Sequence, residues 1–129
     1  MAEAAALAFA AAIISEMGIE DSYFHTDNEM LVHYLNGIDC SWMPSWDSKP
    51  FTHMFINHTK HKRIQVLKIP RSGNNKAHML ARSAFTNVDF PCNIGFSCTN
   101  EDHVNSCPLK LALCNVKWES IPSIAASCC

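Results

Sequence analysis

The first stretch of the chain has the apolar spacing of a helix. Its main apolar side chains share one helical stripe: Leu7, Ala10, Ile14 and Met17. The alanines of residues 2–17 favour helix, and Gly18 follows as a stop signal. Glu3 falls on the same stripe, four residues before Leu7. Its carboxylate is therefore placed either toward the interior or, as a first-turn acid that complements the helix dipole, in water.

A short strand is predicted over residues 21–26, and a second helix follows it. Thr26 and Glu29 have capping-box spacing, and Gly37 marks the end of that helix. Asp27 therefore lies just past the carboxyl end of a strand, where ligand-binding residues collect in open α/β sheets. Asp27 is equally suited to cap the helix, and the local sequence leaves both roles open.

The middle of the chain predicts one more strand between two helices. Residues 51–59 predict a short helix, residues 63–69 a strand, and residues 76–86 a helix that Asn74 or Asn75 caps. The residues expected to face inward in these two helices are Phe51, Met54, Phe55, Ala77, Leu80, Ala81 and Ala84. Alternating helices and strands imply an α/β fold with parallel strands joined by crossovers.

Beyond Phe90 the periodic pattern ends, and only residues 109–113 and 116–118 suggest structure. We therefore predict a folded domain over residues 1–88 and a Cys-rich, loosely ordered tail over residues 89–129. Six of the seven cysteines follow residue 91, and an odd count does not suit a secreted disulfide framework. No zinc is expected, because the spacing of the ligand types there matches no standard zinc site: Cys98, His103, Cys107 and Cys114.

The chain shows no targeting signal. The apolar run over residues 4–14 lacks the basic start of a signal peptide, and no apolar stretch reaches the roughly 18 residues of a membrane span. We expect an intracellular protein, nuclear or cytoplasmic, without a membrane partner.

Charge is divided along the chain. Residues 1–48 carry eight acids and no Lys or Arg, whereas residues 49–82 carry eight bases and no Asp or Glu. Such asymmetry favours a polyanion-binding surface, although two solvated faces of opposite sign would give the same pattern. Trp42 and Trp46 suit either base stacking or coverage of the core.

Four short motifs support one family. They are A-E-A-A-A-L at residues 2–7, H-T-D-N at 25–28, I-P-R-S-G-N at 69–74 and A-H-M-L-A-R at 77–82. In this order they resemble the reverse-transcriptase-associated ribonuclease H-like domain of plant retroelements, over residues 1 to about 85. The resemblance implies a five-stranded mixed sheet with flanking helices. It also implies hydrolysis of the RNA strand of an RNA–DNA hybrid with Mg²⁺ (or Mn²⁺).

The same resemblance implies site residues. Glu3, Asp27 and His78 are the expected catalytic residues, with Glu3 facing inward and with Glu3 and Asp27 as metal ligands. We expect these three side chains to lie together. The residues expected to bind nucleic acid, independently of its sequence, are Lys60, Lys62, Arg63, Lys68, Arg71, Asn74 and Lys76.

Two departures from the family bear on activity. The family's first three strands, the first with a catalytic Asp, precede the helix at which this sequence begins, so we expect a fold that lacks them. His78 stands at the last carboxylate position, and histidine is a poor Mg²⁺ ligand. We expect a nucleic-acid-binding domain, nominally a hybrid ribonuclease but inactive as it stands. The alternative is a non-catalytic module derived from a retroelement that binds nucleic acid or another protein.

Overall fold

The computed structural model describes residues 2–38, 41, 44–86, 94–98, 107–115 and 124–128. For residues 83–86, 94–98 and 124–128 it describes the backbone alone. The chain divides into two compact units, Met1–Gly73 and Asn74–Cys129, and each is described by itself. The domain boundary predicted after residue 88 lies inside the second unit.

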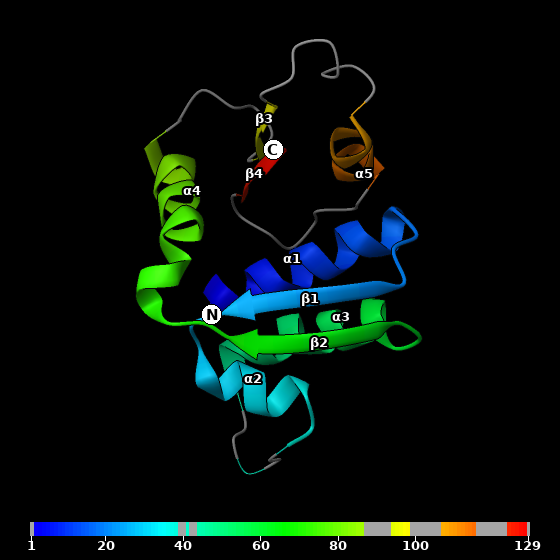
Figure 1. Cartoon of the computed structure of the whole chain (residues 1–129), viewed down its shortest axis with the longest axis vertical. Coiled ribbons are helices and arrows are strands. Elements are labelled where there is room, and N and C mark those ends of the chain that lie inside the picture. Colours follow the sequence, from blue (N-terminus) through cyan, green and yellow to red (C-terminus); the bar gives the residue numbers. More distant parts are fainter. Residues whose placement is uncertain are drawn as a thin grey trace. The chain divides into compact units, whose positions relative to one another are not determined.

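The first unit is a two-stranded parallel sheet with helices. Its elements are α1 (Ala2–Glu16), β1 (Asp21–Thr26), α2 (Glu29–Leu35), the 3-10 turn η1 (Trp46–Ser48), α3 (Lys49–Thr59) and β2 (Arg63–Lys68). β1 and β2 run side by side, with Asp21 opposite Arg63 and Thr26 opposite Lys68 (Figure 1). The helices and strands predicted over residues 2–69, and the parallel pairing, are confirmed.

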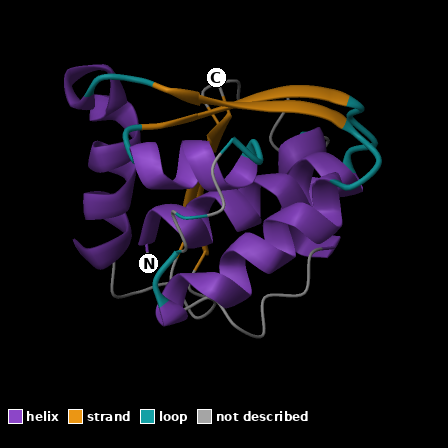
Figure 2. Ribbon diagram, turned by 90° about the horizontal axis from the view of Figure 1, so that it is seen from below, coloured by secondary structure: helices purple, strands orange, loops and turns teal. Residues whose placement is uncertain are grey.

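One face of this sheet carries the core. α1 and α3 lie on the same side of the two strands (Figure 2). Phe24 and Val66 point into that layer, where the ring of Phe55 meets Phe24 edge to face at 4.9 Å. The core cluster consists of Ala4, Leu7, Ala8, Ala11, Phe24, Leu31, Phe55 and Val66. Phe55 is only 1% exposed, so it is the central side chain of the unit.

The stripe predicted for α1 is confirmed in part. Leu7 is in the core and the half-buried Ala10 and Ile14 pack against it, whereas Met17 is 38% exposed. The centre of the buried face lies at Ala4, Leu7, Ala8 and Ala11. Because α1 is apolar on nearly every side, spacing alone does not single out one face, and the small alanines allow close packing on α3. Glu3 is exposed, so its expected inward orientation was wrong.

α2 starts one or two residues later than predicted. Asn28, not Thr26 or Asp27, caps the helix, and its side chain accepts a hydrogen bond from the backbone N–H of Leu31 at 3.3 Å. The Thr26 hydroxyl accepts from the N–H of Asn28 at 3.2 Å and so supports the cap. Gly37 ends the helix as predicted, with φ of +67°, a conformation that glycine adopts without strain.

A side chain closes the outer edge of β2. Asn36, just after α2, donates from Nδ2 to the Val66 carbonyl at 2.7 Å and accepts at Oδ1 from the Val66 N–H at 3.1 Å. The backbone N–H of Arg63 donates to the Glu20 carbonyl on the β1 side. Backbone groups alternate in direction along a strand, so those of Val66, three residues later, point away from β1. The Asn36 amide thus takes the place of a neighbouring strand.

The second unit begins at Asn74, the last residue of the 3-10 turn η2 (Arg71–Asn74), so this turn spans the junction. It holds α4 (Asn75–Thr86), β3 (Ile94–Cys98), α5 (Pro108–Asn115) and β4 (Ile124–Cys128), and β3 pairs with β4 in parallel. The predicted helix over residues 76–86 is confirmed as α4, and residues 109–113 lie in α5. Residues 116–118 lie outside the described part of the chain, and β3 and β4 were not predicted.

The inward face predicted for α4 was wrong where it is described. Ala77 and Ala81 are exposed and Leu80 is half-buried, whereas the side chain of Ala84 lies outside the described set.

Among the helices that the structure describes, none combines the length and the apolar character that crossing a membrane requires.

Candidate functional site

The carboxyl ends of β1 and β2 bring two motifs together. Asp27 directly follows β1, and Arg71 follows β2 after a two-residue connection. The N–H of Ile69 donates to the Thr26 carbonyl at 2.9 Å, so the strand pairing continues one residue beyond β2. Arg71 Nε lies 3.7 Å from Asp27 Oδ2. The Asp27 side chain is 11% exposed and that of Arg71 is 86% exposed.

A second ion pair lies at the same end of the sheet. Lys68, the last residue of β2, donates from Nζ to Glu29 Oε2 at 2.6 Å, and both side chains are about half exposed. The hydrogen bond and the charge of Lys68 hold the pKa of Glu29 below its usual value. His33, one turn further along α2, has Nε2 at 3.9 Å from the other Glu29 oxygen.

Two more ion pairs occupy the opposite end of the strands. Arg63 binds Asp21 with two hydrogen bonds, of 2.6 and 2.8 Å, which hold the pKa of that carboxyl below its usual value. Lys62 lies 3.5 Å from Glu20, and its ammonium group also donates to the Ile19 carbonyl at 2.9 Å. The Lys62 side chain is only 11% exposed, so it is part of the fold at this end.

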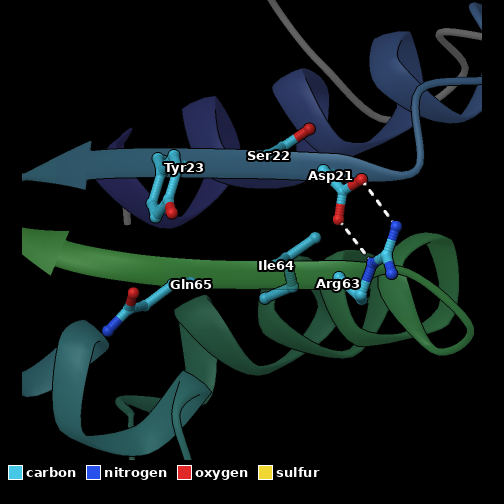
Figure 3. A pocket seen from close by; sticks show the side chains of 6 residues that line it. All are labelled: Asp21, Ser22, Tyr23, Arg63, Ile64 and Gln65. Carbon is cyan, nitrogen blue, oxygen red and sulfur yellow. Dashed lines mark hydrogen bonds and ion pairs between the residues drawn. The ribbon is translucent and has the colours of Figure 1, made fainter.

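An open hollow of about 420 Å³ lies beside the Arg63–Asp21 pair (Figure 3). The residues that line it are Asp21, Ser22, Tyr23, Arg63, Ile64 and Gln65. Tyr23 is 71% exposed there. This hollow is at the amino ends of the strands, whereas Asp27 follows the carboxyl end of β1, so it is distinct from the Asp27 site.

The predicted catalytic residues are distributed over both units. Glu3 lies on the first turn of α1, and the start of α1 is at the same end of the sheet as the tip of β1 (Figure 1). Asp27 lies at that tip. His78 belongs to α4 in the second unit, so the expectation that it joins the two carboxylates stays a prediction. Trp46 is 82% exposed with the Lys49 ammonium 3.8 Å from its ring centre, whereas Trp42 lies outside the described residues.

The carboxylates that the structure describes do not by themselves form a two-metal site. Mg²⁺ requires several hard oxygen ligands in near-octahedral geometry. Within the described part of the chain, no group of three or more His, Cys, Asp or Glu side chains is arranged to hold a metal ion. Glu3 and Asp27 supply carboxylates that suit Mg²⁺ in kind but not in number. No metal-dependent step follows from this geometry.

The division of charge along the sequence has a structural explanation. Four of the basic residues predicted to bind nucleic acid are each paired with an acid from the first 48 residues: Lys62, Arg63, Lys68 and Arg71. The parallel register places Asp21 opposite Arg63, an offset of 42 residues. The same offset relates Glu20 to Lys62, and this repeated spacing is a signal in the sequence for these two pairs, although not for the pairs of Lys68 and Arg71.

Comparison with known proteins identifies the family. The model of a family described as reverse transcriptase-like matches residues 1–84, which is more than half of the chain. No curated protein and no solved structure matches the chain. The match covers all of the first unit and most of α4, including Glu3, Asp27, Arg71 and His78. The chain therefore belongs to the reverse transcriptase-like family, whose members are ribonuclease H-like domains.

Proposed function

We propose that this protein is a retroelement-derived ribonuclease H-like domain that binds nucleic acid, RNA–DNA hybrid or duplex, without regard to sequence. The observation that carries the proposal is the family match over residues 1–84, combined with the place of Asp27 at the carboxyl end of β1. Lys68 and Arg71 lie at the same end of the sheet and are partly or largely exposed. Their charges suit contacts to phosphate oxygens.

The proposed domain does not cleave its ligand as the chain stands. The matched positions in residues 1–129 offer two carboxylates and a histidine, which is too few hard ligands for two divalent ions. Mg²⁺ or Mn²⁺ is the proposed cofactor for any cleavage that occurs. An intracellular location, nuclear or cytoplasmic, fits a domain with this ligand.

Binding is tested by fluorescence anisotropy with a labelled RNA–DNA hybrid and a DNA duplex of the same length. We expect weak binding at low salt that falls as salt rises, with similar affinities for unrelated sequences. Lys60→Gln together with Lys76→Gln is expected to weaken binding, because among the described residues no ion pair involves Lys60 or Lys76. Glu16→Gln is the control on a remote exposed residue. Absence of binding at low salt contradicts the proposal.

Activity is tested on the same hybrid with Mg²⁺ or Mn²⁺. We expect no cleavage above a blank without protein. If cleavage is found, Asp27→Asn decides its origin: loss of cleavage in that variant assigns it to this domain and refutes our expectation of inactivity. Cleavage that persists in Asp27→Asn points to a contaminating nuclease.

A further inference from the structure

The ion pairs at the two ends of the β1–β2 sheet differ in how firmly they hold their cations. At the amino end, Arg63 is fixed by two short hydrogen bonds to Asp21, and Lys62 also binds a backbone carbonyl. At the carboxyl end, Lys68 and Arg71 have one ion pair each, and Arg71 lies beyond hydrogen-bond distance of Asp27. The second pair of cations is therefore the one that can turn to another anion while the fold stays intact.

Accessibility points to the same end. The side chains of Lys68 and Arg71 are 49% and 86% exposed, whereas that of Lys62 is 11% exposed. Carboxylate and phosphate oxygens are alternative acceptors for the same ammonium and guanidinium donors. The Lys68–Glu29 pair is exposed on both sides and contributes little net stability, so a phosphate can replace its carboxylate at small cost. Arg71 is exposed and lies 3.7 Å from the largely buried Asp27, beyond hydrogen-bond distance, so it too can turn to a phosphate.

We propose that Asp27 and Glu29 are an intramolecular competitor of nucleic acid. They hold Arg71 and Lys68 in the unbound protein, and a backbone phosphate binds these two cations by replacing the carboxylates. This inference rests on the proposed nucleic-acid binding and adds to it an acidic segment that limits affinity. Asp27 and Glu29 therefore lower the affinity for any phosphate ligand, and they favour a polyanion that occupies both cations at once.

The test measures the affinity of the full chain for a labelled RNA–DNA hybrid at low salt, with EDTA present to exclude metal effects. Asp27→Asn with Glu29→Gln is expected to bind the hybrid about fivefold more tightly than the unmodified chain. The slope of log K against log salt should stay within about 1 of that of the unmodified chain, because Lys68 and Arg71 neutralise the same phosphates in both proteins. Circular dichroism checks that each variant is folded.

Two further variants separate local release from a general change of charge. Glu16→Gln with Asp47→Asn changes the net charge equally, at exposed residues that do not pair with Lys68 or Arg71, and we expect the affinity for the hybrid to change less than twofold. Adding Lys68→Gln and Arg71→Gln to the Asp27→Asn, Glu29→Gln variant should abolish the gain. The proposal that Asp27 and Glu29 compete with nucleic acid is refuted by either of two results. One is an equal gain in affinity in the Glu16→Gln, Asp47→Asn control, and the other is a gain in affinity that remains after Lys68 and Arg71 are replaced.

The outcomes also distinguish this inference from the proposed function. If the unmodified chain binds and the Asp27→Asn, Glu29→Gln variant binds no more tightly, the competitor is refuted and nucleic-acid binding stands. If only that variant binds, the competitor is supported, and the proposed function of the unmodified chain is refuted. If neither binds at low salt, both proposals are refuted.

Discussion

Single residues decide how the site at the end of β1 is built. Asn28 caps α2 through its hydrogen bond from Leu31, and the neighbouring Asp27 pairs with Arg71 instead. We expect Asn28→Ala to lower the free energy of unfolding by about 1 kcal/mol, as loss of a helix cap does. Asp27→Asn, which removes an ion pair with an exposed partner, should cost less. Urea unfolding of both variants measures the difference. Equal losses in the free energy of unfolding would indicate that Asp27 contributes to the helix cap as much as Asn28 does.

The Arg63–Asp21 pair makes the stability of the fold depend on pH in the acidic range. The pKa of Asp21 is lowered from its usual 3.8 by Arg63. A carboxyl with a depressed pKa in the folded state stabilises the protein above its unfolded pKa and loses that contribution as pH falls through its folded pKa. We expect the midpoint temperature of unfolding to decrease as the pH is lowered below about 4, and to decrease less steeply in Arg63→Gln. Identical pH profiles would show that the pair contributes nothing.

At the scale of elements, the edge of β2 depends on one side chain. Asn36 satisfies both backbone groups of Val66, so Asn36→Ala leaves a donor and an acceptor without these partners. We expect a loss of about 1–3 kcal/mol in the free energy of unfolding, together with a greater tendency to aggregate through the opened edge. Gln65→Ala, at an exposed neighbour in the same strand, is the control and should change stability by less than about 0.5 kcal/mol.

The packing of α3 on the sheet depends on Phe55. This side chain is buried and meets the ring of Phe24 edge to face. Phe55→Ala removes a large ring from a small core and should cost about 3–5 kcal/mol. Since α3 contacts α1 and the sheet together, loss of far-UV and near-UV circular dichroism in parallel is the expected result. A folded variant of unchanged midpoint would mean that the core lies elsewhere.

Much of the first unit could be predicted because local patterns and tertiary packing agree there. The strand over residues 21–26 and the helix that ends at Gly37 follow from periodicity and stop signals. The cap at Asn28 could not be separated from Asp27, since both side chains suit that position and only packing decides. β3 was missed because five residues with Gly95 as the second give no clear alternation.

At the scale of the whole molecule, the sequence indicates two charged halves but not their pairing. Partners such as Asp21 and Arg63 are 42 residues apart, and their contact depends on the register of two strands. The candidate site was predictable to the extent that motifs fix it: Asp27 and Arg71 came from two different motifs and do meet. His78 lies in the other unit and stays a prediction.

The pairing of basic residues with acids of the same chain predicts that the affinity for nucleic acid depends only weakly on salt. If only Lys60 and Lys76 exchange counterions for phosphates, the slope of log K against log salt for the hybrid is about −2. If all six basic residues of the predicted surface did so, the slope would be about −5. Anisotropy titrations at four or five salt concentrations separate the two values. A steeper slope for the unmodified chain would mean that phosphates also bind cations that are paired in the unbound protein, as proposed for Lys68 and Arg71.

The Asn36 amide also gives the sheet a direction of growth. Val66 already has both its backbone partners, so a further strand meets a blocked position on the β2 side. Among the described residues, β2 is the only strand beside β1, and alternate β1 residues turn their backbone groups away from it. An insertion, a duplication or a designed extension that widens this sheet must therefore join at β1. A single amide side chain thus restricts which enlarged versions of the sheet are accessible to evolution.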